Sequence, residues 1–250
     1  MHSMFMVKRA YSSRIIIGLL SVLVALALFP QTAFAHPMGN FSVNRYSRLA
    51  VGGEAVELLY IVDMAEIPTH AERTLMDSDG DKAISTQEEQ DYLASMATTL
   101  SSQLLLTLDG EAATWTLGEH TIHFRPGQAD LPILRMEFTL RAPLPAASDV
   151  HELTYLDESY AGRMGWKEVI VAPSNEVELL ASDVPQTDLS NMLQEYPVDL
   201  LQNPPAVDGA SISWQPATAS SAQNGQQRAT EASRGLTTSS LGGDRFAELI

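Results

Sequence analysis

Residues 41–62 read FSVNRYSRLAVGGEAVELLYIV, and this stretch indicates the fold class. Apolar and polar residues alternate over 41–51 and again over 55–62, with Gly52-Gly53 between the two runs. Alternation with a period of two is typical of a strand that buries one face, and a Gly-Gly pair supplies a tight turn. The stretch therefore predicts a β-hairpin.

Strand-like runs recur after residue 100 and are separated by turn signals such as Asp109-Gly110. Many short strands at this spacing favour a sandwich of two sheets. We therefore expect a mainly β fold, an Ig-like antiparallel β-sandwich that spans residues 36–203. The further runs are 103–108, 113–117, 120–125, 133–141, 151–156, 168–172 and 177–182.

One helical unit interrupts the strands at residues 64–100. Its centre, DSDGDKAISTQE at residues 77–88, has the pattern of a twelve-residue EF-hand calcium loop. Calcium takes six to eight oxygen ligands, and the EF-hand supplies them from loop positions 1, 3, 5, 7, 9 and 12. In this chain those positions are Asp77, Asp79, Asp81, Ala83 (through its backbone carbonyl), Ser85 (directly or through water) and Glu88 (with both oxygens).

The loop departs from the EF-hand pattern at its sixth position, where Lys82 replaces the usual glycine. The chain turns sharply there, and a positive φ costs a non-glycine residue on the order of 1 kcal/mol. We therefore expect weak calcium binding between helices at 68–76 and 86–100. The alternative is a solvated acidic turn between two helices.

The first 35 residues have the organisation of a signal peptide. A basic region is followed by an apolar run at 15–29 and by an A-x-A cleavage site at 33–35. The run is shorter than the ~20 residues that a spanning helix needs, although an uncleaved anchor is the alternative. We expect an exported chain that is periplasmic or extracellular, with membrane association as a further possibility. Cleavage would make His36 the mature N-terminus.

The composition excludes several classes of function. The formal net charge is −16, and loss of the three basic leader residues takes it to −19. Such a chain repels nucleic acid and anionic lipid, so we expect no nucleic-acid partner. It has no cysteine, hence no disulfide and no thiolate ligand. No nucleophile motif or phosphate-binding loop is present, and we expect no enzymatic activity.

The composition changes after residue 203, where Ser, Thr, Ala, Gln and Gly replace most large apolar residues. A segment of this kind buries too little surface to fold. We predict a disordered linker at 204–243, followed at 244–250 by the start of a possible C-terminal helix, DRFAELI.

Three further segments are distinctive besides the acidic loop. They are HPMGNFSVNRY at 36–46, YIVDMAEIP at 60–68 and GWKEVIV at 165–171. Together they resemble the extracytoplasmic N-terminal region of bacterial NicO-type nickel/cobalt transporters, over about residues 36–183. In that family the region precedes a linker and a polytopic membrane core, which this chain does not contain. The resemblance implies a role accessory to such a transporter, so that with the predicted calcium loop we expect a calcium-binding accessory domain. The alternative is a stand-alone secreted or periplasmic calcium-stabilised binding module.

Histidines are the candidate ligands for nickel or cobalt. The α-amine and imidazole of a mature N-terminal His36 could chelate either ion. The alternative is that His36 only marks the cleavage point. His120 and His123 lie three residues apart in a predicted strand, where their side chains point to opposite faces, which favours structural or surface roles.

Overall fold

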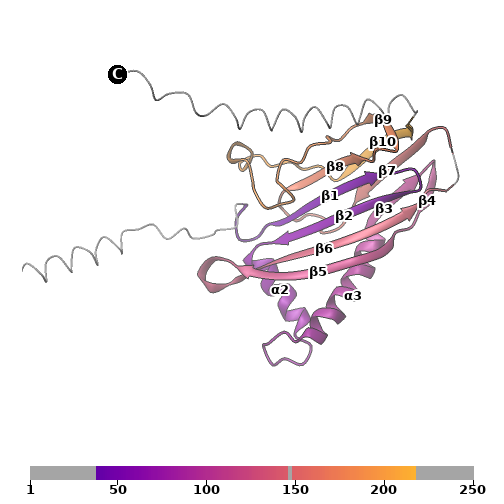
Figure 1. The fold of residues 1–250 in the computed structure, drawn as a ribbon. Helices are drawn as coiled ribbons and strands as arrows, with labels where there is room; N and C mark the ends of the chain where they lie inside the picture. Colours follow the sequence, from indigo (N-terminus) through magenta and orange to yellow (C-terminus); the bar gives the residue numbers. More distant parts are fainter. Residues whose placement is uncertain (1–37, 146–147, 218–250) are drawn as a thin grey trace, which may run out of the picture. The chain divides into compact units, whose positions relative to one another are not determined.

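The computed structural model describes residues 38–145 and 148–217, which belong to one compact unit (Figure 1). Two sheets of five strands dominate these ranges, with strand orders β5-β6-β2-β1-β8 and β4-β3-β7-β10-β9. The first sheet contains β1 (Val43–Val51), β2 (Ala55–Met64), β5 (Thr116–Pro126), β6 (Pro132–Pro143) and β8 (Lys167–Pro173). The second contains β3 (Leu104–Leu108), β4 (Glu111–Ala113), β7 (His151–Asp157), β9 (Val177–Ser182) and β10 (Gly209–Pro216). Short 3-10 turns are η1 (Gln128–Asp130) and η2 (Val198–Leu200).

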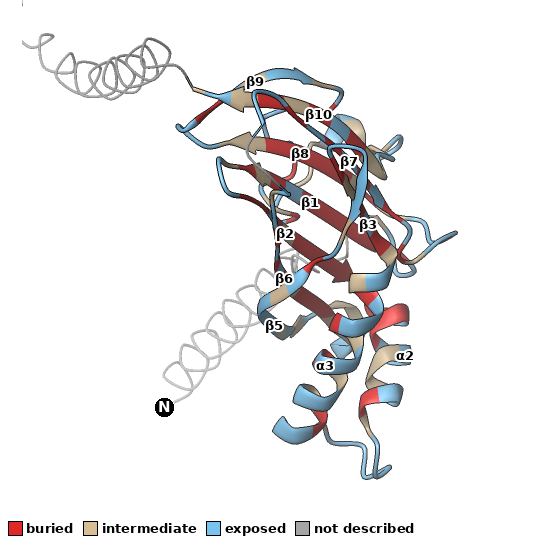
Figure 2. Cartoon of the chain, turned by 90° about the vertical axis from the view of Figure 1, so that its right-hand side faces the viewer, coloured by how far each residue is buried: buried red, intermediate tan, exposed pale blue. Residues whose placement is uncertain are grey.

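The two sheets share one hydrophobic core. Alternate residues of the first sheet, such as Leu49 and Leu58, belong to the same buried cluster as Leu106, Tyr155 and Trp214 of the second. Figure 2 shows the buried positions along the facing strands. The mainly β, sandwich-like arrangement is therefore confirmed, whereas the Ig-like topology stays a prediction.

The prediction of a purely antiparallel sandwich is wrong at one pair of strands. β1 and β8 run parallel, with Arg45 opposite Lys167, while the other pairs among the described strands are antiparallel. The segment 158–166 crosses from β7 in the second sheet to β8 in the first. β8 therefore enters the first sheet from the end at which β1 begins.

The strand predicted at residues 113–117 is also wrong, because β4 ends at Ala113 and β5 begins at Thr116. Trp115 lies between them, and its indole N–H donates to the Leu104 carbonyl at 2.7 Å. The side chain is buried in the shared core. Because its large ring is buried and bonded to β3, Trp115 separates β4 from β5 within the predicted strand.

The helical unit lies where the sequence predicts it. Helix α2 (Glu66–Met76) begins two residues before the predicted 68, and α3 (Thr86–Gln103) ends three residues after the predicted 100. Both helices project from the sheets, with the loop that joins them at their tip (Figure 2). Their inner faces join the shared core through Met76, Leu93, Ala97 and Leu100. In the described part of the chain, no helix has the length and apolar character that crossing a membrane requires.

The prediction that the chain is a disordered linker from residue 204 is wrong as far as residue 217. Strand β10 lies there, hydrogen-bonded between β7 and β9. Ala210, Ile212 and Trp214 are buried along one of its faces, while serines occupy the intervening positions. A strand needs apolar residues only at alternate positions, so low average hydrophobicity hid it. The signal peptide predicted at 1–35, His36, the part of the predicted linker from 218 to 243 and the helix predicted at 244–250 lie outside the described residues.

A buried polar network joins the two sheets beside the start of β1. The guanidinium of Arg45 lies 3.2 Å from Asp157 Oδ1 and 2.7 Å from Asp208 Oδ1, and it also donates to the Ser159 carbonyl. Tyr60 donates its hydroxyl to Asp157 Oδ2 at 3.1 Å. Burial raises the pKa of Asp157 above its usual range, although Arg45 opposes that shift. The network therefore depends on the cation of Arg45.

Candidate metal site

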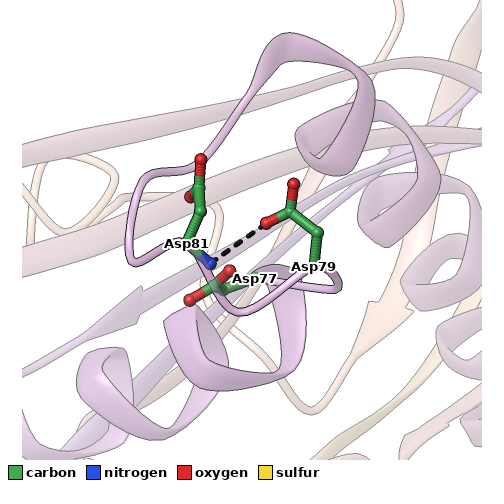
Figure 3. A group of neighbouring side chains, drawn as sticks. All are labelled: Asp77, Asp79 and Asp81. Atoms are coloured by element: carbon green, nitrogen blue, oxygen red, sulfur yellow. Dashed lines mark hydrogen bonds between the residues drawn. The ribbon is translucent and has the colours of Figure 1, made fainter.

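The tip of the helix pair brings three carboxylates together. Asp77, Asp79 and Asp81 each place an oxygen within 4.8 Å of the other two (Figure 3). Calcium binds oxygens at 2.3–2.6 Å, so two of its ligands lie at most about 5 Å apart. The spacing of the three oxygens thus permits one shared cation.

Backbone hydrogen bonds orient these carboxylates. The N–H of Lys82 donates to Asp77 Oδ2 at 3.0 Å and that of Asp81 to Asp79 Oδ1 at 3.1 Å, while that of Ala83 donates to Asp81 Oδ1 at 2.7 Å. The second oxygen of Asp77, Oδ1, is buried and has no hydrogen-bond partner. A buried polar atom without a partner costs about 1–3 kcal/mol, which a bound cation would offset.

The backbone of the loop takes the turn that the calcium pattern requires. Lys82 has φ of 69° and Gly80 has φ of 76°. The expectation that Lys82 occupies a position suited to glycine is therefore confirmed. Its side chain does not alter the bond from its N–H to Asp77, so the substitution adds conformational cost without removing a contact.

Glu88 does not belong to the group of three oxygens. Its Oε1 accepts from the N–H and hydroxyl of Ser78 at 2.7 and 3.0 Å, and its Oε2 accepts from the N–H and hydroxyl of Ser85, each at 2.9 Å. Ser85 is the N-cap of α3 and forms a capping box with Glu88. Glu88 therefore closes the loop by bonding to Ser78, which lies ten positions earlier in the chain.

The structure thus divides the six predicted ligands into two groups. Three aspartates converge, whereas Ser85 and Glu88 bond to each other and Ala83 donates to Asp81. Sequence reasoning missed Ser78 as a partner of Glu88. The only signal in the sequence for this contact was that Ser78 carries a hydroxyl and directly follows the first aspartate of the loop.

Four donors hold the pKa of Glu88 down to about 2, compared with an ordinary value of 4.5. The N–H and hydroxyl of Ser85 lower it most, followed by the N–H of Ser78. A carboxylate with a lowered pKa stabilises the fold fully above pH 4.5, and this contribution is lost as pH falls towards 2. Glu88 therefore stays ionised throughout the neutral and mildly acidic range.

We expect Glu88→Gln to lower the melting temperature in the presence of chelator, with the largest deficit above pH 4.5. The deficit should narrow towards pH 2, because the wild-type carboxylate is then protonated as well. Melting curves from pH 2 to 7 measure this effect. Glu89→Gln, at the next residue, is the control and should show no such pH dependence. A deficit that is independent of pH would show that Glu88 acts through shape alone.

The histidines form no comparable group in the described ranges. His120 and His123 lie on β5, as the strand prediction required. His120 stacks on Phe138 with a centroid distance of 6.4 Å, and its Nδ1 lies 3.2 Å from the Gly118 carbonyl. These contacts are structural. Nickel or cobalt binding through His36 stays a prediction from the sequence.

Comparison of the chain with models of known protein families and with curated proteins found no match.

Proposed function

We propose that this chain is a non-enzymatic, calcium-binding extracytoplasmic domain. The observation that carries the proposal is the convergence of one oxygen from each of three aspartates, one of which, Asp77, also has a buried Oδ1 without a hydrogen-bond partner. The twelve-residue pattern and the positive φ of Lys82 add support.

The donor set favours calcium over other ions. The side-chain donors are all oxygens, whereas nickel and cobalt favour imidazole nitrogen. Magnesium demands a tight octahedron and keeps most of its waters, so it makes less use of the many oxygens that this twelve-residue loop offers. Calcium is also abundant outside the cytoplasm, so a weak site would be filled there.

Calcium would act by joining the two helices at their tip. Asp77 follows the end of α2, and Glu88 lies in the first turn of α3. Nearer the sheets, Tyr92 of α3 already donates its hydroxyl to Glu72 of α2 at 2.6 Å. A cation would remove the repulsion between the loop carboxylates and add a second link between the two helices, at their tip.

The biological setting that we propose is an accessory domain of a nickel/cobalt transporter. It rests on the resemblance of segments 36–46, 60–68 and 165–171 to the NicO-type extracytoplasmic region. The stand-alone secreted or periplasmic module is the alternative. A neighbouring reading frame that encodes spanning helices would favour the accessory role.

We expect calorimetry to give a calcium Kd of ~10⁻⁵ to 10⁻³ M for the wild-type chain. Asp79→Asn should weaken binding roughly tenfold or more, since even residues that only support a metal ligand commonly contribute that much. Calcium should raise the melting temperature, and magnesium should raise it less. Asp91→Asn, at an exposed position on α3, is the control that removes the same charge outside the loop.

Equal binding by the Asp79 and Asp91 variants would show that calcium meets only a diffuse acidic surface. Identical melting curves in chelator and in millimolar calcium would also contradict the proposal.

A further inference from the structure

Four large apolar side chains are exposed at one end of the first sheet. The exposed fractions are 65% for Phe41, 76% for Met164, 44% for Ile67 and 41% for Leu131. Phe41 precedes β1, Met164 precedes β8, Ile67 lies in the first turn of α2, and Leu131 lies between β5 and β6. Figure 1 shows β1 beginning and β2 ending beside the tip of the β5–β6 hairpin.

Hydrogen bonds tie these four segments side by side. Val43 N–H donates to the Met164 carbonyl at 2.9 Å, and Ile67 N–H donates to the Asn40 carbonyl at 3.0 Å. The N–H of Gln128, three residues before Leu131, donates to the carboxylate of Glu66 at 2.8 Å. The four exposed side chains, Phe41, Ile67, Leu131 and Met164, therefore lie on segments that meet at this end of the sheet, and we call them the apolar rim.

The exposed charged residues directly beside Met164 and Leu131 have opposite signs, whereas the chain as a whole carries −16. Arg163 beside Met164 and Asp130 beside Leu131 are exposed and balance each other, while Glu66 is buried. Exposed apolar residues are common singly, but a group drawn from several loops marks an interaction surface.

The chain outside the described residues indicates what this surface meets. Met38 is the first residue that the structure describes, and it lies three residues before Phe41. The apolar run at 15–29 lies earlier in the chain. The eight residues 30–37 span at most about 29 Å even when fully extended. A bilayer that holds the apolar run during export therefore lies within that reach of Met38, which is three residues from Phe41 of the apolar rim.

We propose that the apolar rim docks on a lipid bilayer, with the side chains of Phe41 and Met164 in the interfacial region. Side chains at loop tips can enter this region without disturbing the sheets that support them. Burial of apolar area drives such binding, and no charge attraction is needed. Because the rest of the chain is acidic, docking should favour zwitterionic lipid and weaken as anionic lipid is added.

The absence of cysteine allows a direct test on the full chain. Phe41→Cys and Met164→Cys, each labelled with an environment-sensitive dye, should show a blue shift with phosphatidylcholine vesicles and quenching by a lipid-borne quencher. Leu75→Cys on α2 and Leu180→Cys on β9 are controls at exposed apolar positions outside the rim. Their dyes should show neither effect.

Three results would overturn the proposal. The first is unchanged emission at both rim positions on addition of vesicles. The second is an equal response at the control positions, which would mean that no particular face docks. The third is a blue shift at the rim without vesicles, which would show that a second copy or another part of the chain covers it. None of these results bears on calcium binding by the loop.

Discussion

Truncation of the chain after Asn203 is expected to abolish folding of the domain, whereas truncation after Ala217 should leave it folded. The shorter chain lacks β10, which lies between β7 and β9 and hydrogen-bonds to both. Its removal exposes two strand edges and opens the core at Trp214, which is fully buried. Domains are stable by only about 5–15 kcal/mol, so the loss of a strand that is paired on both sides exceeds what the fold can tolerate.

Circular dichroism and urea unfolding of the two truncated chains measure this difference. Trp214→Ala in the full chain isolates the largest single contribution and should lower the free energy of unfolding by about 3–5 kcal/mol. Ser213→Ala, at the neighbouring half-buried position of β10, is the control and should change it little. A cooperative unfolding transition in the chain that ends at Asn203 would show that β10 is dispensable.

Replacement of the buried cation of the core, Arg45→Met, is expected to lower the free energy of unfolding by about 3–5 kcal/mol at pH 7. Methionine fills much of the same volume, but Asp157 would lose its buried cationic partner. Tyr60 and Ser159 would still bond to Asp157 without neutralising its charge. The cost arises because a buried carboxylate without a cation is poorly solvated.

The dependence on pH identifies the charge as the cause. The pKa of Asp157 is raised in the folded protein, so its protonated form is favoured there and stability falls as pH rises through that pKa. Without Arg45 this effect should grow, and the deficit of Arg45→Met should therefore shrink as pH is lowered. Arg48→Met, at an exposed position on the same strand, is the control and should change stability by less than about 0.5 kcal/mol. A deficit that is constant from pH 7 to pH 4 would point to packing alone.

Features that depend on neighbouring residues could be predicted from the sequence. The β1–β2 hairpin follows from alternation around Gly52-Gly53, and the helix pair lies on either side of the acidic loop, as predicted. The three aspartates converge because alternate loop positions, Asp77, Asp79 and Asp81, are turned inward by bonds to backbone N–H groups a few residues away. No distant segment is needed for this arrangement.

Features that join distant residues were decided by the tertiary structure. Strand β10 has low average hydrophobicity although its apolar residues alternate, and only the tertiary structure places it between β7 and β9. The parallel pairing of β8 with β1 depends on where the crossover at 158–166 enters the first sheet. Ser78 holds Glu88 only because the closed loop brings them together. The apolar rim likewise exists only where four loops meet.

The physical reason is the range over which each interaction acts. Hydrogen bonds within a turn and the periodicity of one element act over a few residues, so the sequence by itself determined the hairpin, the helix pair and the aspartate cluster. Burial depends on which strands become neighbours after the chain has closed loops of many residues. The packing of Trp214 and the pairing of Arg45 with Asp157 and Asp208 join residues more than 100 positions apart, so only the tertiary structure could establish them.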